Sequence, residues 1–473
     1  MKKSKRMMAL GLAVAMAATG LAGCGSSEPA GTSAESSQEG AGTTAAAASG
    51  ETKKEAEASS DEKVTIHFST WIADGQQDAI DNFYKAVAKF NETYPNIEVI
   101  LDTQPTNKAD DYEQKYNMLL LSGDKTDIIH NKSMEIYNNR ASKGLFAPID
   151  EYMTESGTSM DDYRISTTLS DGKTYGLPSE SDANLVFLNK DALDEAGLPV
   201  PDANWTWDDY AEYAKKLTKD VNGKKRYGSI APFWDDPVMY YLGVAQSKDD
   251  NPLFKDAEHH NFDDPVLKEW LEFKYQLGNV DKTEVSYKDY TTGSLNYQSE
   301  FFNGNAAMLV TGLFSLGSIT NTESFPHDFT TAVSILPRWK DSPLGAERDS
   351  CGIYGINANI DEEKKEAAYK FIDFYSKEGL LYMGKVPMYK DVSIDSVVES
   401  VQADQPELVD AESLEAYLSN PDRHAHVVST LPPSDAEMKS ILKEEADKYM
   451  SDGQTIDEAI NNMVKRADAV LAQ

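Results

Sequence analysis

The side chains that could do chemistry in this chain form no recognisable catalytic pattern. No Gly-x-Ser-x-Gly, P-loop, Gly-x-Gly-x-x-Gly or His-Glu-x-x-His motif occurs. His424 and His426 could share one side of a strand, but no further ligand is spaced to complete a metal site, which favours a surface loop. Residues 220–224 faintly resemble a calcium loop, yet Lys224 takes a ligand position, which favours a hairpin turn. We therefore expect no catalytic residue, no metal and no cofactor.

Aromatic side chains at the ends of apolar segments suggest binding instead. Trp71 follows the alternating segment 64–69, Trp234 follows a short apolar run, and Phe314 ends the stretch 301–314. Each ring taken alone favours ordinary core packing. Open α/β sheets bind ligands at the carboxyl ends of their strands, and aromatic faces stack on the C–H faces of sugars. Together these rings predict a carbohydrate site in which polar side chains take the hydroxyl groups.

The first residues have the parts of an export signal. A basic start precedes the apolar run 7–21, which is too short to span a membrane comfortably. The ending Leu-Ala-Gly-Cys resembles the lipobox of bacterial lipoproteins, and this predicts a signal peptide over 1–23 and a lipid (palmitate-type) anchor on Cys24. The alternative is an ordinary signal peptide with an incidental cysteine. Residues 24–61 are rich in Gly, Ser, Ala, Thr and Glu, which predicts a disordered linker.

Composition bounds the rest of the chain. The body from about residue 61 to residue 473 is long enough for two domains. A formal net charge of −34 argues against nucleic-acid binding, because phosphates would be repelled. Cys351 is the only cysteine besides Cys24, so we expect it to be a buried apolar residue outside any disulfide.

The elements that must position the aromatic rings follow from hydrophobic periodicity. The opening pattern is β-α-β-α-β, which predicts a mostly parallel sheet with helices on its faces. A second α/β region follows Pro178, and the chain ends in helices, one of them introduced by a capping box at Thr455 and Glu458. The main expected strands are 64–69, 97–101, 127–129, 185–188 and 306–310, and the main expected helices lie around 80–90, 112–121, 206–217, 361–375 and beyond 455.

Four segments of the chain occur in a recognisable order: Gly176-Leu177-Pro178 with 185–190; 196–198 with Trp205-Thr206-Trp207-Asp208-Asp209; Phe302-Asn303-Gly304-Asn305-Ala306-Ala307-Met308 to Gly312; and 453–459. Together they resemble the extracellular solute-binding proteins of family 1, the maltose-binding-protein-like receptors of ABC importers. Leu188 stands where that family usually has tyrosine, and Phe314 stands where it usually has tryptophan.

The resemblance implies an α/β fold of the type II periplasmic-binding-protein class, with two hinge-linked lobes and a cleft between them. Crossings between the lobes are expected near Pro178, Gly352 and Pro387. The N-lobe would comprise 62–177 plus 353–387, and the C-lobe 178–352 plus 388–473.

The resemblance also implies a site and a role. The chain would be a monomeric, lipid-anchored receptor on the outer face of the bacterial cell membrane, binding a mono- or oligosaccharide and delivering it to the membrane subunits of an ABC importer without catalysis. The residues expected to face the ligand are Trp71, Asp74, Asn131, Glu180, Asp182, Trp234, Phe314 and Arg348, the last being equally explained as a surface charge.

Three other functions stay open at this point. Within the binding class, the ligand could be a peptide, a polyamine or a phosphorylated compound, and a cleft lined by carboxylates would favour a polyamine. An exported glycosidase would need two carboxylates at a fixed separation and would turn its substrate over. A sensory receptor that presents its ligand to a membrane kinase would have the same sequence features.

Overall fold

The computed structural model describes residues 63–472 apart from 73–76, 104–108, 123–125, 222, 235, 248–250, 257, 343–345, 349–350, 421–423, 427–431 and 433. Residues Asp61–Gln473 form one compact unit by their own contacts. The signal, the linker, Cys24 and Asp74 therefore lie outside the described residues, and so does the side chain of Arg348.

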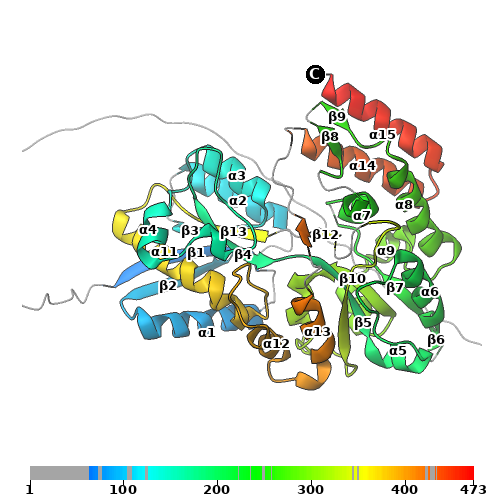
Figure 1. Cartoon of the computed structure of the whole chain (residues 1–473), viewed down its shortest axis with the longest axis horizontal. Coiled ribbons are helices and arrows are strands. Elements are labelled where there is room, and N and C mark those ends of the chain that lie inside the picture. The colour runs from blue at the N-terminus through cyan, green and yellow to red at the C-terminus, as the bar shows by residue number, and fades with distance from the viewer. Residues whose placement is uncertain are drawn as a thin grey trace, which may run out of the picture. The chain divides into compact units, whose positions relative to one another are not determined.

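The first sheet is mixed, with strand order β2-β1-β3-β13-β4 (Figure 1). Its strands are β1 (Val64–Thr70), β2 (Ile97–Thr103), β3 (Ile128–Asn131), β4 (Gly176–Ser181) and β13 (Cys351–Ile356). The three strands from the start of the chain are parallel, as predicted, whereas β13 is antiparallel to both β3 and β4. This antiparallel insertion comes from a distant part of the sequence, which local periodicity does not reveal.

Helices surround this sheet, and the first of them packs against it through one apolar stripe. They are α1 (Gln77–Thr93), α2 (Ala109–Ser122), α3 (Met134–Ser142), α4 (Asp150–Ser156) and α11 (Glu362–Lys377), with the short η1 (Met160–Asp162) and η4 (Gly379–Met383). Phe83 and Phe90 lie seven residues apart on the buried face of α1. Phe68 on β1 packs against Phe83 and Phe371, with ring centroids 5.3 and 5.5 Å apart. These rings form the centre of the first hydrophobic core.

The second sheet has the order β11-β5-β10-β7-β6. Its strands are β5 (Asn184–Asn189), β6 (Lys219–Val221), β7 (Lys224–Ile230), β10 (Ala306–Gly312) and β11 (Thr331–Ile335). β10 runs parallel to β7 and antiparallel to β5, so every residue of β10 is buried at the middle of the sheet. The antiparallel pairing of β6 with β7 confirms the hairpin predicted between them.

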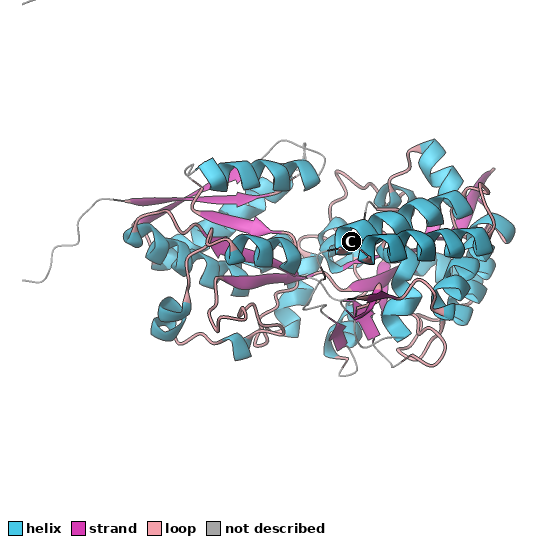
Figure 2. Ribbon diagram, turned by 90° about the horizontal axis from the view of Figure 1, so that it is seen from above, coloured by secondary structure: helices cyan, strands magenta, loops and turns pink. Residues whose placement is uncertain are grey.

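The helices around the second sheet enclose a separate core. Those that follow β5 are α5 (Lys190–Ala196), α6 (Trp207–Leu217), α7 (Val238–Ser247), α8 (Pro265–Tyr275), η2 (Gln276–Val280), α9 (Tyr287–Gly293), α10 (Tyr297–Phe302) and η3 (Leu313–Ser318). Those that close the chain are α12 (Ile394–Gln402), η5 (Pro406–Leu408), α13 (Ala411–Ser419), α14 (Asp435–Met450) and α15 (Ile456–Leu471). Figure 2 shows helices around the strands of both sheets.

Helix starts follow the capping pattern of the sequence. Thr206 accepts a hydrogen bond from the Asp209 N–H at 3.2 Å, and the Thr206 N–H donates to the Asp209 carboxylate at 2.8 Å. Thr455 and Glu458 make the same pair of bonds at the start of α15. Both capping interactions confirm the predicted helix boundaries.

Short strand pairs complete the described fold: β8 (Phe254–Asp256) with β9 (His259–His260), and β12 (Ala346–Arg348) with β14 (His424–His426). The second pair corrects the expectation that His424 and His426 lie in a surface loop, because their backbone pairs in parallel with β12. The partner strand lies far away in the sequence, so the pairing has no local signal.

Three chain segments lie side by side where the two cores adjoin. β4 pairs with β13 on one side. On its other side, the Ser181 N–H donates to the Val386 carbonyl at 2.8 Å, and the Met388 N–H donates to the Ser179 carbonyl at 2.9 Å. These are the segments in which crossings between lobes are expected.

Candidate ligand-binding site

The end of β10 presents an exposed aromatic ring. β10 stops at Gly312, and Phe314 lies in the following 3₁₀ turn η3 rather than in the strand itself. A Cβ atom on Gly312 would stand only 2.5 Å from the Phe314 ring, so the ring folds back over Gly312 and a side chain there would have to displace it. Phe314 is still 40% exposed. The ring is therefore packed against the protein on one side and partly open to solvent on the other.

Two more aromatic residues support this ring. Trp234 lies beside Phe314, with ring centroids 6.0 Å apart and planes tilted by 57°. Tyr297, at the start of α10, meets Trp234 edge to face at 5.9 Å. Burial raises the pKa of Tyr297 to about 12, so its hydroxyl stays protonated and can donate a hydrogen bond. The structure thus brings together Trp234 and Phe314, which were predicted from the sequence, and adds Tyr297.

Asp182 lies next to this aromatic group. A Cβ atom on Gly312 would come within 3.2 Å of the Asp182 carbonyl oxygen. The Leu313 N–H donates to the Ala183 carbonyl at 3.0 Å, which fixes the turn bearing Phe314 against the loop between β4 and β5. The backbone of Asp182 therefore lies beside the aromatic surface, whereas its carboxylate oxygen Oδ1 is buried and the carboxylate acts on the Lys385 ammonium. The exposed ring suits a ligand with an apolar C–H face.

The Glu180 side chain interacts with other residues of the protein. The residue is buried and forms an ion pair with the Lys385 ammonium, while its second oxygen lies 3.6 Å from His130 Nε2. Burial alone would raise the pKa of Glu180, but the attraction of Lys385 and His130 outweighs it and holds that pKa below the ordinary value. The predicted role of Glu180 as a direct ligand contact therefore gives way to a role in this buried cluster.

His130 completes the cluster. Its Nδ1 lies 3.0 Å from the Thr70 hydroxyl, and its Nε2 lies 3.2 Å from the Ser179 hydroxyl. Burial lowers the pKa of His130 to about 4, more than the neighbouring Glu180 carboxylate raises it. The imidazole is therefore neutral near pH 7. Lys385 and His130 carried no local motif, and only the expected crossing near Pro387 pointed to this part of the chain.

Asn131 lies away from any solvent. It is fully buried, its Oδ1 accepts from Arg140 Nη1 at 2.6 Å, and its Nδ2 donates to the Ile353 carbonyl at 2.9 Å. Arg140 is buried as well and pairs with Glu113 at 2.8 Å. The amide links β3, β13 and α3 inside the first core, so we do not include Asn131 in the candidate site.

Trp71 is an exposed residue just after the first strand of the first sheet. It follows β1 directly and is 41% exposed, which is as open as Phe314. β1 is the central strand of the three parallel strands, and Trp71 stands at its carboxyl end. Each sheet therefore places one exposed aromatic ring just beyond the carboxyl end of a central strand.

A family model described as bacterial extracellular solute-binding protein matches residues 74–379, more than half of the chain. The chain belongs to this family. The matched region includes both sheets except β1 and ends in η4, so it contains Asp182, Trp234 and Phe314.

Relatives of this solute-binding protein bear different names. An arabinooligosaccharide-binding protein of Halalkalibacterium halodurans is 24% identical over 64% of this chain and 66% of its own length. The sn-glycerol-3-phosphate-binding periplasmic protein UgpB of Escherichia coli is 27% identical over 61% of this chain and 66% of its own length. The chain thus spans just under two thirds of either relative.

Solved structures show the same fold. A sugar transporter from Rhizobium etli, in an open conformation, superimposes on 86% of this chain and 99% of its own with a TM-score of 0.67 at 23% identity. The solute-binding protein therefore has the two-lobed α/β fold of periplasmic binding proteins, as the sequence predicted. Within the residues that the structure describes, no helix combines the length and apolar character required to cross a membrane.

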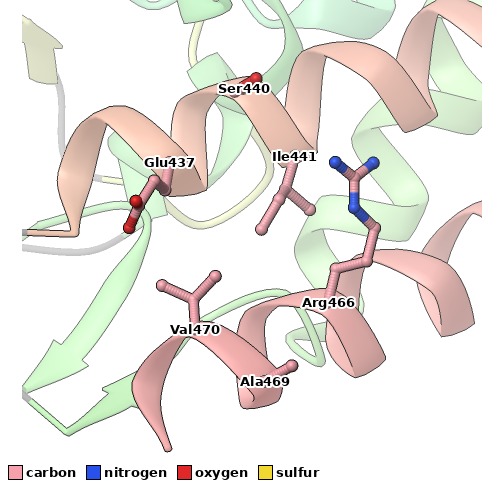
Figure 3. A pocket seen from close by; sticks show the side chains of 6 residues that line it. All are labelled: Glu437, Ser440, Ile441, Arg466, Ala469 and Val470. Atoms are coloured by element: carbon pink, nitrogen blue, oxygen red, sulfur yellow. The ribbon is translucent and has the colours of Figure 1, made fainter. Parts of the chain in front are cut away.

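A small pocket of about 310 Å³ lies elsewhere, between α14 and α15 (Figure 3). Its lining residues are Glu437, Ser440, Ile441, Arg466, Ala469 and Val470. The Arg466 guanidinium is engaged with Glu444 and Glu445, both at 2.8 Å. The pocket contains none of the predicted site residues, and we do not assign the ligand to it.

Proposed function

We propose that this solute-binding protein captures a carbohydrate and delivers it to the membrane subunits of an ABC importer. The observation that carries the proposal is the exposed Phe314 ring, backed by Trp234 at 6.0 Å and placed beside Asp182. Aromatic faces bind the C–H faces of sugars, and a carboxylate accepts hydrogen bonds from their hydroxyl groups. The relative named as an arabinooligosaccharide-binding protein and the sugar transporter with the same fold support this ligand class.

The proposed lobes keep the bounds that the family resemblance implies. The N-lobe (62–177 plus 353–387) would contain most of the first sheet and the C-lobe (178–352 plus 388–473) the second sheet, with the boundary passing through β4 and β13. The ligand would then be held between Trp71 on one lobe and the Phe314 group on the other, with Asp74 and Arg348 as further contacts. Capture needs no covalent chemistry, because binding energy from both lobes favours the closed state.

The cellular setting is also part of the proposal. An extracellular receptor that feeds a membrane importer benefits from staying at the membrane, and a lipid on Cys24 with the linker 24–61 would provide such an anchor. We propose that the protein works as a monomer on the outer face of the cell membrane. Mass spectrometry of the protein made in a bacterial host would show a diacyl or triacyl mass on Cys24, and an unmodified N-terminus would refute the anchor.

A phosphorylated polyol is the second candidate ligand class, because UgpB is named as binding sn-glycerol-3-phosphate. The group around Phe314 favours a neutral sugar, since its described side chains are aromatic and the backbone beside the ring belongs to the acidic residue Asp182. The Lys385 cation near it already pairs with Glu180. A phosphate would meet repulsion at this position unless a cation elsewhere compensated for it.

A thermal-shift screen tests the function directly. The compact unit Asp61–Gln473 is heated with mono- and oligosaccharides, glycerol 3-phosphate, a polyamine and a short peptide. A ligand that binds only the native state raises the melting temperature, and we expect this for a sugar. A shift with another class alone would refute carbohydrate binding. Sugar recovered intact after prolonged incubation would support a binding role, whereas hydrolysis products would show an enzyme.

A further inference from the structure

Two glycine backbones touch where η3 meets the chain after η4. Gly384 ends η4 with a φ of +63°, and its N–H donates to the Leu381 carbonyl at 3.1 Å. A Cβ atom on Gly384 would lie 3.2 Å from Gly317 Cα, and a Cβ atom on Gly317 would lie 3.2 Å from the Met383 carbonyl oxygen. Neither backbone leaves normal room for a side chain. The two backbones therefore pack closely, and movement of one segment toward the other is transmitted through this contact.

Gly317 belongs to the same short turn as Phe314. This turn is braced at its middle and at its last residue, since Gln298 Nε2 donates to the Ser315 hydroxyl at 3.2 Å and to the Ser318 hydroxyl at 3.1 Å. A turn with these bonds moves as one piece. A ligand that presses on the Phe314 ring thus moves Gly317, three residues further along the same turn, and Gly317 contacts Gly384.

The residue after Gly384 reaches the other part of the candidate site. Lys385 forms its ion pair with Glu180, two residues before Asp182 on the same chain segment. Burial lowers the pKa of Lys385, but the attraction of the Glu180 and Asp182 carboxylates outweighs it, so the net shift is upward. The Lys385 ammonium is therefore charged at neutral pH and is attracted by both carboxylates.

Backbone bonds place this contact within the adjoining segments. Val386, the next residue, accepts from the Ser181 N–H at 2.8 Å, and the bridge between Glu180 and Pro387 continues the pairing. The dipeptide Gly384-Lys385 thus contacts the Phe314 turn on one side and the end of β4 on the other. It leads directly into the segment where the third crossing between lobes is expected.

We propose that the dipeptide Gly384-Lys385 couples the ligand site to the hinge. In this account Gly384 transmits movement of the Phe314 turn, while Lys385 is a positioning residue that holds the end of β4 and, through it, Asp182. Ligand bound to Phe314 and Asp182 then biases one short segment, which sets the balance between open and closed lobes. The inference rests on the proposed function for the identity of the ligand, and on the contacts above for the coupling.

The first test inserts a methyl group into the glycine contact. Gly317→Ala needs no left-handed backbone and places its Cβ 3.2 Å from a carbonyl oxygen of the hinge-side segment. Gly278→Ala is the matched control, because its Cβ would also meet a backbone atom at 3.2 Å, but on Ser286 inside the second core. Dyes on cysteines at the exposed Met118 and Val280 report the distance between lobes by single-molecule fluorescence transfer.

We expect Gly317→Ala to shift the distribution of lobe distances in the ligand-free protein and to change sugar affinity by roughly tenfold. Gly278→Ala should leave both at the wild-type values. Unchanged distances and affinity in Gly317→Ala would overturn the inference, and so would an equal change in the control. The ligand-free distances decide the coupling even if no sugar binds the wild-type protein, an outcome that would refute only the proposed function.

The second test removes the ion pair. The double variant Glu180→Gln with Lys385→Met should shift the lobe distances and weaken sugar binding, and Lys385→Arg with wild-type Glu180 should retain both properties. Lys274 and Glu284 form another buried ion pair within the second core, so Lys274→Met with Glu284→Gln serves as the control. We expect this control to alter only the unfolding transition. If both double variants change affinity and lobe distances alike, Lys385 has a merely structural role.

Discussion

Tryptophan rings around the second sheet are used in two different ways. Trp207 and Trp270 pack together with ring centroids 4.9 Å apart, and both are buried. Their indole N–H groups donate within the protein, to Gln246 Oε1 and the Met239 carbonyl, each at 2.8 Å. Trp234 instead lies only half-buried against Phe314, a ring that is 40% exposed.

The difference shows what separates a core ring from a binding ring in the same lobe. A core tryptophan has both faces covered and its donor satisfied, so it contributes to stability. A ring that the protein supports along one edge and leaves open elsewhere contributes little to stability and can stack on a ligand. Substitutions in the core group should therefore lower the free energy of unfolding and leave sugar affinity unchanged. Substitutions in the binding group should lower sugar affinity and change the free energy of unfolding little.

The largest expected effect is on stability in the core group. Trp270→Ala removes a fully packed side chain and should lower the free energy of unfolding by about 3–5 kcal/mol. Urea titration followed by circular dichroism measures this change. Sugar affinity of the fraction that remains folded should be unchanged, because Trp270 lies in the core. If Trp270→Ala lowered the free energy of unfolding by less than about 1 kcal/mol, the assignment of Trp270 to the core group would be wrong.

The next effect concerns pH and the buried imidazole. The pKa of His130 falls from 6.5 to about 4 on folding, so the unfolded chain binds more protons between these values. Stability is therefore full above pH 6.5 and declines as the pH falls toward 4. We expect the free energy of unfolding to drop by about 2 kcal/mol between pH 7 and pH 5 from this residue. His130→Gln should reduce that slope, and a variant with an unchanged slope would refute the assignment.

In the binding group the expected effect is on affinity. Trp234→Ala should weaken sugar binding by roughly tenfold to a hundredfold, since it removes the ring that supports Phe314. The free energy of unfolding should change by only about 1 kcal/mol, because Trp234 is half-buried. Calorimetric titration and urea unfolding of the same preparation give both numbers. Wild-type affinity in this variant would place Trp234 with the core rings.

The smallest expected effect is on stability and concerns the N-terminal cap of the core helix α6. Thr206→Ala removes the cap of α6, the helix that begins with Trp207. The loss of the bond from the Asp209 N–H should cost about 1 kcal/mol of stability, and sugar affinity should not change. Thr206→Ser keeps the hydroxyl and serves as the control. A loss of affinity in Thr206→Ala would show that the core of this lobe and the site are not independent.

Local signals in the sequence predicted much of the fold. Capping residues Thr206 and Thr455 and the apolar alternation of β1 depend on neighbours within a few residues, so they can be read along the chain. The antiparallel β13 and the pairing of β12 with β14 depend on partners far away in sequence, and periodicity contains no information about them.

The same limit applies to the site. Strand ends identified Trp71, Trp234 and Phe314 as exposed or half-exposed rings because the carboxyl edge of a sheet is a property of each strand. Whether a polar side chain at such an edge faces a ligand or another segment depends on tertiary contacts. Glu180 meets Lys385 across 205 residues of sequence, and Asn131 meets Ile353 across 222, so neither outcome could be predicted locally.

The central claim is that the Phe314 ring binds a sugar, and a series at this position tests it most directly. The compact unit Asp61–Gln473 is titrated calorimetrically with the sugar that gives the largest thermal shift. We expect Phe314→Ala to weaken binding of this sugar by roughly tenfold or more. Phe314→Trp, which keeps an aromatic ring at this position and enlarges its stacking face, should bind at least as tightly as the wild type. Wild-type affinity in Phe314→Ala would contradict the account.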